Sequence, residues 1–144
     1  MGYDEVEFFL AEAVARGYNV GGTADTHYNN AITASILWWG GSAVQAAAYL
    51  AQPSVAYATA AGNYKQKIGT QKYLALYTRG WDEWIEVRRL DYPVLVAPSS
   101  ALTAFPVRYT YPVNEQNLNT TNYNAAATAI GGDKVITKLF WDKF

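Results

Sequence analysis

The stretch YDEVEFFLAEAVARG, residues 3–17, predicts the first helix and with it a mainly α fold. Asp4 can cap this helix together with Glu7, which follows three residues later. Apolar side chains recur along one helical face, at Val6, Phe9, Leu10, Ala13 and Val14. Gly17 suits the residue at which a chain leaves a helix. We therefore expect an amphipathic helix whose apolar face packs against a neighbour.

A second helix is expected after the loop GGTAD, with Thr23 or Asp25 as its cap and Gly40 and Gly41 as its stop. Its apolar stripe is formed by Tyr28, Ile32, Ile36 and Trp39. The stripe predicts that Trp39 packs in the core. Small residues on both helices, which let two backbones approach closely, are Ala11, Ala13, Ala15, Ala31 and Ala34. The two helices are thus expected to form an antiparallel pair that resembles a tetratricopeptide-type unit.

Three further helices are expected before residue 93. They cover residues 42–52, 63–78 and 80–90. The first of the three stops before Pro53, because the residue before a proline is disfavoured in a helix. Gly69 lies inside the second, where glycine costs about 1 kcal/mol relative to alanine. We therefore expect that Gly69 is needed for close packing.

The C-terminal third is expected to be largely extended. Prolines at four positions impose extended or turning backbone, namely Pro93, Pro98, Pro106 and Pro112. The stretch PVRYTYP alternates like a short edge strand or an ordered loop. A last short helix is predicted near residues 120–130, before Gly131 and Gly132. Phe140 and Trp141 are expected to be buried, and no flexible linker between domains is expected.

The stretch GWDEWIEVRRLDYP, residues 80–93, is rich in charges and indoles. Its acidic residues fall in the first turn of the expected helix and Arg88 and Arg89 in the last, which matches the helix dipole. Trp81, Trp84, Ile85 and Arg88 fall on one side, so the arginine stem can lie along an indole. Glycosidase chemistry would need two carboxylates about 5 to 9.5 Å apart, taken from Asp82, Glu83 or Glu86. Since no second carboxylate cluster, nucleophile motif or metal spacing accompanies them, we interpret the stretch as a structural helix and expect no enzyme.

Composition excludes several other classes of protein. The chain has 144 residues, a net charge of −1 and no cysteine. No excess of lysine and arginine is available for phosphate contacts, so no nucleic-acid partner is expected. No apolar run approaches the roughly 20 residues that cross a bilayer, and the N-terminus has no secretory signal pattern. No cofactor and no metal site are expected, because a single histidine without cysteine does not make one.

Trp38 and Trp81 are the candidate ligand-binding residues. Neighbouring helix positions point about 100° apart, so Trp38 and Trp39 cannot both face the same core seam. Trp38 is therefore the more exposed candidate for packing against a sugar ring. His27 is expected to be an ordinary surface or capping residue. An asparagine group is expected to serve turns and caps, namely Asn114, Asn117, Asn119, Asn122 and Asn124.

The order of motifs resembles a known family. The series runs LAEAVARGY, HYNNAITAS with WG, YLAQPSVAY, IGTQKYLAL, GWDEWIEVRRLDYPVL, PVRYTYPVNEQNLN, NYNAAATAIGGD and LFWD. Each motif is weak by itself, but together and in this order they look like the C-terminal part of SusD/RagB-family proteins. The resemblance covers nearly the whole chain. It implies that residues 1–144 are the C-terminal segment of a SusD-like domain, with the family's N-terminal part absent from this chain.

This resemblance also implies a function. Family proteins are Bacteroidetes outer-membrane lipoproteins that present oligosaccharides, such as starch, at the cell surface to a SusC-like TonB-dependent transporter. The implied fold is mainly α, with tetratricopeptide-like helix pairs of the α-α superhelix type, an extended proline-rich segment and a last short helix. Membrane association would come only from a lipid anchor that this chain lacks. This segment is then expected to be mainly scaffold for glycan binding and nutrient uptake.

The alternative is a helix-pair module that binds a protein or peptide without a role in transport. A repeat array would show self-similarity at about 34 residues over at least three units. One pair is visible in this sequence, and the P-x-R-x-x-Y-P segment has no place in a simple repeat. The uptake hypothesis is therefore favoured.

Overall fold

The computed structural model describes residues 2–142, which form helices and loops without strands. The mainly α prediction is confirmed. The chain divides into two compact units, Met1–Val94 and Leu95–Phe144. The division falls in the proline-rich segment that follows the last helix of the first unit.

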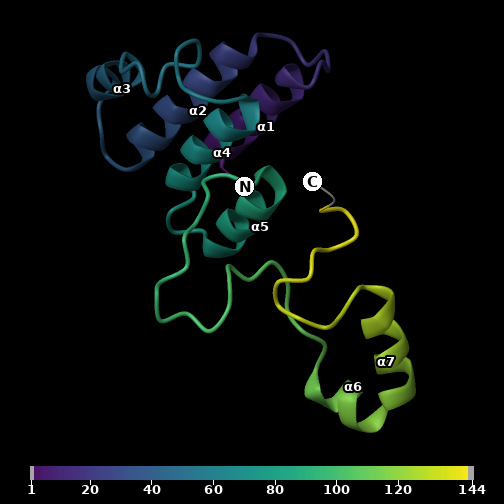
Figure 1. Ribbon diagram of the computed structural model, residues 1–144. Helices are drawn as coiled ribbons and strands as arrows, with labels where there is room; N and C mark the ends of the chain where they lie inside the picture. The colour runs from purple at the N-terminus through teal and green to yellow at the C-terminus, as the bar shows by residue number, and fades with distance from the viewer. Residues whose placement is uncertain (1, 143–144) are drawn as a thin grey trace. The chain divides into compact units, whose positions relative to one another are not determined.

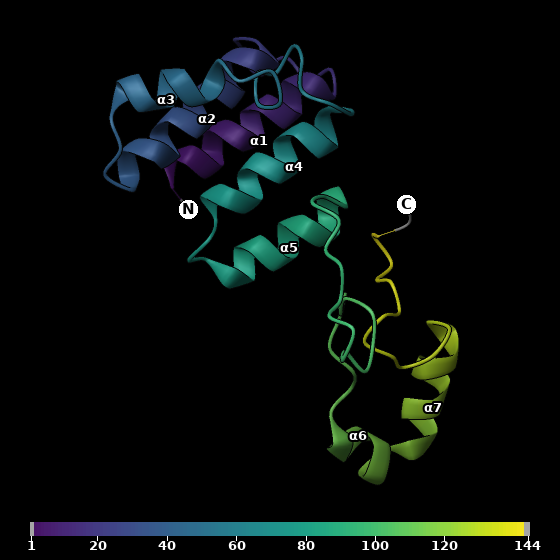
Figure 2. The same ribbon diagram turned by 60° about the vertical axis from the view of Figure 1, so that its left-hand side comes forward.

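Unit 1 is a helical assembly built on an antiparallel pair (Figure 1). Its helices are α1 (Tyr3–Ala15), α2 (Ala24–Trp38), α3 (Ala43–Leu50), α4 (Tyr64–Ala75) and α5 (Gly80–Leu90). Helices α1 and α2 pack along each other, α3 packs on α2, α4 packs on α1, and α5 packs on α4 (Figure 2). The expected helix pair is therefore confirmed, and α4 extends it into a three-helix layer.

Side-chain caps fix where several of these helices begin. Thr23 caps α2 by accepting a hydrogen bond from Thr26 N at 3.1 Å, so Thr23 rather than Asp25 is the cap. Ser42 and Gln45 form a capping box at the start of α3. The expected Asp4 cap is wrong, because α1 already begins at Tyr3 and no side chain caps it. The Asp4 carboxylate instead pairs with the guanidinium of Arg79.

The apolar face expected for α1 is wrong. The core residues of this helix are Phe8 and Ala11, whereas Val6 is 39% exposed. The other buried residues of α1 are Glu5, Glu7 and Glu12. These carboxylates are buried because each pairs with a cation or imidazole from another helix or from the loop before α5. With these ion pairs, α1 buries a face that differs from the face marked by its apolar residues.

The stripe expected on α2 is confirmed for Tyr28 and Ile32 and wrong at Trp39. Tyr28 is buried, its hydroxyl donates to the carbonyl of Val55 at 2.8 Å, and burial raises its pKa. Its ring meets Phe8 edge to face with centroids 6.4 Å apart. Trp39 is 52% exposed because α2 ends at Trp38 and leaves Trp39 at the rim of the unit.

The expected packing role of Gly69 is confirmed. A β-carbon built on Gly69 would lie 2.9 Å from the carbonyl oxygen of Tyr92 and 3.4 Å from Cβ of Leu90. A side chain at residue 69 would therefore push the end of α5 away from α4.

Unit 2 contains the short helices α6 (Val113–Leu118) and α7 (Thr120–Ala129). Helix α7 was expected, whereas α6 was not. The PVRYTYP stretch is an ordered loop, in which Val107 N donates to Val135 O at 2.8 Å. The loop is also held by Arg108, whose guanidinium lies 3.1 Å from the buried carboxylate of Asp133. The expected burial of Phe140 and Trp141 is wrong, since both side chains are exposed.

Candidate functional site

An open groove lies between α2, α3 and α4, with a volume of about 480 Å³. This size is within the range of small-molecule sites. Trp39 and Tyr49 supply aromatic surface, and Gln45, Gln71 and Ser35 supply polar groups. Ile32, Ile36 and Leu74 form the apolar part of the lining. The residues that line the groove include no charged side chain.

Two carboxamides in the groove are oriented by neighbouring donors. The Gln45 oxygen accepts from the backbone nitrogen of Ser42 at 2.8 Å and from its hydroxyl at 3.1 Å. The Gln71 oxygen accepts from the Tyr49 hydroxyl at 3.0 Å. An amide oxygen only accepts, so the NH2 group of each carboxamide is the group that can donate to a ligand. Sequence reasoning missed both glutamines, although the spacing of Ser42 and Gln45 is that of a capping box.

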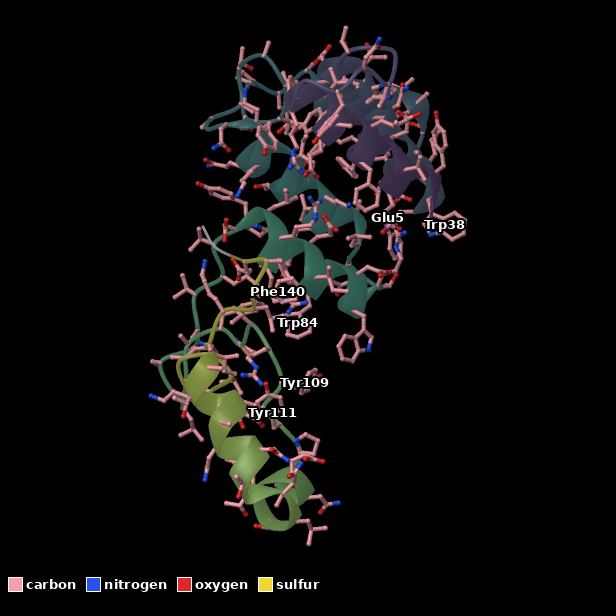
Figure 3. All side chains as sticks on the ribbon, turned by 90° about the vertical axis from the view of Figure 1, so that its right-hand side faces the viewer. Glu5, Trp38, Trp84, Tyr109, Tyr111 and Phe140 are labelled. Carbon is pink, nitrogen blue, oxygen red and sulfur yellow. The ribbon has the colours of Figure 1, made fainter. Side chains whose placement is uncertain are left out.

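The two sequence-predicted ligand residues lie outside this groove. Trp38 is 83% exposed and projects from the end of α2 (Figure 3). Trp81 is exposed near the start of α5 and packs edge to face on Trp84, with centroids 5.7 Å apart. The Arg88 guanidinium lies 3.8 Å from the centroid of the Trp84 ring, as the sequence predicted. The structure therefore places the two candidates on different helices, and neither lines the groove with Trp39.

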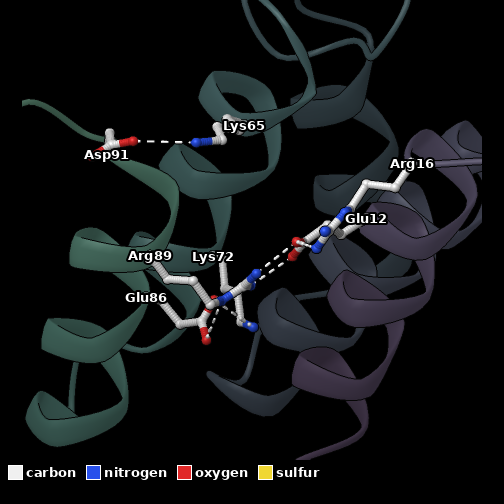
Figure 4. A network of polar contacts seen from close by, with 7 residues as sticks. All are labelled: Glu12, Arg16, Lys65, Lys72, Glu86, Arg89 and Asp91. Carbon is white, nitrogen blue, oxygen red and sulfur yellow. Dashed lines mark hydrogen bonds and ion pairs between the residues drawn. The ribbon is translucent and has the colours of Figure 1, made fainter. Parts of the chain in front are cut away.

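A buried ion-pair network joins α1, α4 and α5 (Figure 4). Arg89 binds Glu12 through two hydrogen bonds of 2.6 Å and reaches Glu86 at 2.6 Å. The Lys72 ammonium lies 3.1 Å from Glu86 and 3.3 Å from the centroid of the Phe9 ring. Burial lowers the pKa of Lys72, and the nearby Glu86 carboxylate opposes that shift. Burial alone would raise the pKa of Glu12, but the hydrogen bonds and charge of Arg89 outweigh it and lower that pKa.

This network also bears on the carboxylates considered for catalysis. Glu86 is buried and held by two cations, so it is not a free acid or base. Burial raises the pKa of Glu83, and a hydrogen bond with Tyr73 opposes the shift. Within residues 2–142, no group of three His, Cys, Asp or Glu residues is arranged to hold a metal ion. Glu86 and Arg89 of α5 are therefore engaged in ion pairs with α4 and α1.

His27 has a larger structural role than the surface or capping role expected from the sequence. Its Nδ1 lies 2.6 Å from a Glu7 carboxylate oxygen, and its Nε2 lies 2.9 Å from the carbonyl of Gly21. Both partners are acceptors, so only the doubly protonated imidazolium donates to both. The hydrogen bond with Glu7 raises the pKa of His27, and that with Gly21 adds to the effect. His27 thus joins α1, α2 and the loop between them.

We expect the unfolding temperature of the chain to fall as pH rises from about 6 to about 8. The pKa of His27 is higher in the folded chain than in the unfolded chain. The stabilisation that the His27 imidazolium provides is therefore complete below the pKa of the unfolded state and is lost as pH rises through the pKa of the folded state. His27→Gln should flatten this slope, measured by circular dichroism melts at several pH values. His27 is the only histidine in the chain, which makes the comparison specific. Equal slopes in the two chains would contradict the assignment.

Two members of the asparagine group make local side-chain hydrogen bonds in α6 and α7. Asn119 Nδ2 donates to Glu115 at 2.9 Å, and Asn122 Nδ2 donates to Asn119 at 2.7 Å. These contacts agree with the expected structural role of the asparagines.

Comparison with known proteins gives the family. The family model described as "Starch-binding associating with outer membrane", SusD-like, matches residues 1–112. A comparison with curated proteins gave no match. No described helix is long and apolar enough to cross a membrane.

Solved structures agree with this family. The Bacteroidetes AC2a SusD-like protein is 32% identical over 100% of this chain, with a TM-score of 0.85, and 30% of its own length is covered. A SusD homologue from Bacteroides thetaiotaomicron VPI-5482 is 27% identical over 100% of this chain, with a TM-score of 0.79 and 38% of its length covered. A chitin-binding SusD homologue from Flavobacterium johnsoniae is 29% identical over 99% of this chain, with a TM-score of 0.78 and 36% of its length covered.

These matches identify an all-helical protein with tetratricopeptide-like pairs. The chain belongs to the SusD-like family. It spans about a third of the length of these solved relatives.

Proposed function

We propose that this chain is part of a non-catalytic, glycan-binding component of an outer-membrane uptake complex. Its partners would be an oligosaccharide and a SusC-like TonB-dependent transporter. The observation that carries the proposal is the family match over residues 1–112, described as starch-binding and outer-membrane associated. The chitin-binding relative, which matches 99% of this chain, supports a saccharide as the ligand class.

Unit 1 supplies scaffold in this proposal. Charged residues of unit 1 such as Arg89 and Lys72 form ion pairs between helices. Such ion pairs hold the helices together, as a rigid support requires. Trp38 and Trp81 offer exposed indoles on which a sugar could pack. The lipid anchor and the cell-surface location belong to the same proposal, by analogy with the family.

Isothermal titration calorimetry with chito-oligosaccharides and malto-oligosaccharides tests the proposal. We expect saturable heat with a dissociation constant near the millimolar range, about 4 kcal/mol of binding free energy. Ligand must therefore be supplied at millimolar concentration. Sorbitol serves as the control, because it offers hydroxyl groups without a ring. Equal heats for sorbitol and for all oligosaccharides would contradict glycan binding by this chain.

A further inference from the structure

We propose that the groove between α2, α3 and α4 binds one ring of a neutral saccharide. Trp39 is the stacking surface, and the amides of Gln45 and Gln71 are hydrogen-bond donors. The inference rests on the proposed glycan-binding function and gives it a site different from Trp38 and Trp81. It also extends the role of this segment beyond scaffold.

Trp39 is placed to accept the apolar face of a sugar. Its ring lines the groove beside Ile36 and Leu74 and remains 52% exposed, so part of the indole is open to a ligand. Tyr77 meets it edge to face with centroids 6.4 Å apart, which restrains its orientation. The C–H bonds of a sugar ring carry positive partial charge and suit the negative face of an indole. An oriented indole loses little side-chain freedom on binding.

The polar groups of the groove suit hydroxyl groups. The oxygens of Gln45 and Gln71 already accept hydrogen bonds from Ser42 and Tyr49, so each amide is held with its nitrogen as the remaining donor. Neutral N–H donors can bind the lone pairs of sugar hydroxyl oxygens. Two oriented donors near one aromatic surface match a ring that has polar edges and an apolar face.

The lining of the groove has no charged side chain, which favours neutral sugars over charged ones. Burying a carboxylate or phosphate without a counter-charge is costly, and none of the lining residues supplies one. Lys72 follows Gln71 in the chain, but its ammonium is turned to Glu86 of α5. A neutral sugar is therefore preferred over a uronic acid or a phosphorylated sugar.

Calorimetry on the full chain and three variants tests the site, with chitotriose, maltotriose and trigalacturonic acid as probes. Trp39→Ala is expected to weaken binding of the better neutral probe about tenfold, as for a central aromatic anchor. Gln45→Glu retains a residue that can complete the capping box but removes the neutral donor, and should weaken binding about fivefold or more. Trigalacturonic acid should bind the unmutated chain at least about tenfold more weakly than the neutral probe.

Val44→Ala is the control, because Val44 directly precedes Gln45 on α3, is exposed and does not line the groove. It should leave the affinity within about twofold, as for a residue outside the contact. Circular dichroism melts check that each variant is folded. Unchanged affinity in folded Gln45→Glu and Trp39→Ala would overturn the groove while leaving the proposed function intact, since the sugar would then bind elsewhere on the chain. Absence of saccharide binding by the unmutated chain would overturn both the groove and glycan binding by this chain, and would leave this segment as scaffold only.

Discussion

Arg89→Ala is expected to lower the free energy of unfolding by about 3 to 5 kcal/mol. Arg89 is the shared cation of Glu12 and Glu86, with contacts of 2.6 Å to each. Its removal leaves Glu12 buried without its bidentate partner and leaves Glu86 with Lys72 alone. Removing one member of a buried ion pair lowers the free energy of unfolding by more than the intact pair adds to it, because the remaining charge stays buried without a partner. Chemical denaturation monitored by circular dichroism measures the loss.

Arg16→Ala is the control for this experiment. Arg16 also contacts Glu12, at 3.4 Å, but its side chain is half exposed. Water replaces such a contact, so the change should stay below about 1 kcal/mol. If Arg89→Ala and Arg16→Ala lower the free energy of unfolding by similar amounts, the buried network stabilises the fold no more than an exposed ion pair does.

Phe8→Ala is expected to destabilise unit 1 by about 3 to 5 kcal/mol. The Phe8 ring is 1% exposed and packs edge to face on Tyr28, so its loss leaves a cavity between α1 and α2. The same denaturation measurement gives the value.

Val6→Ala tests whether the structure or the helical periodicity places the core face of α1 correctly. Val6 belongs to the face expected from the sequence, yet it is exposed. Its truncation should cost about 1 kcal/mol or less, because it removes only two methyl groups from a residue that is already 39% exposed. If Val6→Ala lowers the free energy of unfolding more than Phe8→Ala does, the core face of α1 is the one predicted from its apolar periodicity.

Helix positions were predictable because their signals are local. The cap at Thr23 and the stop at Gly17 act within a few residues of the helix ends. Gly69 was also recognised as a packing position, since a glycine inside a helix is costly without such a reason. The family resemblance rested on the order of such local motifs.

The buried face of α1 could not be predicted in this way. Periodicity counts glutamates as solvent-facing, but Glu12 is buried by Arg89, which lies 77 residues further along the chain. Such a pairing depends on how α5 returns to α1, and a single sequence carries no signal for it. Apolar residues alone therefore indicated the wrong face.

The candidate groove depends on tertiary arrangement in the same way. Trp39 was assigned to the core because it continues the stripe of α2, but the helix ends one residue earlier. Gln45 and Gln71 come from two helices that meet only in the folded unit. The sequence could indicate which indoles are available, such as Trp38, but not which polar groups would lie beside them.

Arg89 has a further consequence for how unit 1 opens. Its guanidinium is bonded at once to α1 and to its own helix α5, while Glu86 holds Lys72 of α4. Separating α5 strips counter-charges from both α1 and α4, whereas separating α1 or α4 strips a counter-charge from α5. Local fluctuations that free a single helix therefore carry an electrostatic cost, and we expect the three helices to exchange their amide protons as one cooperative element in native-state hydrogen exchange.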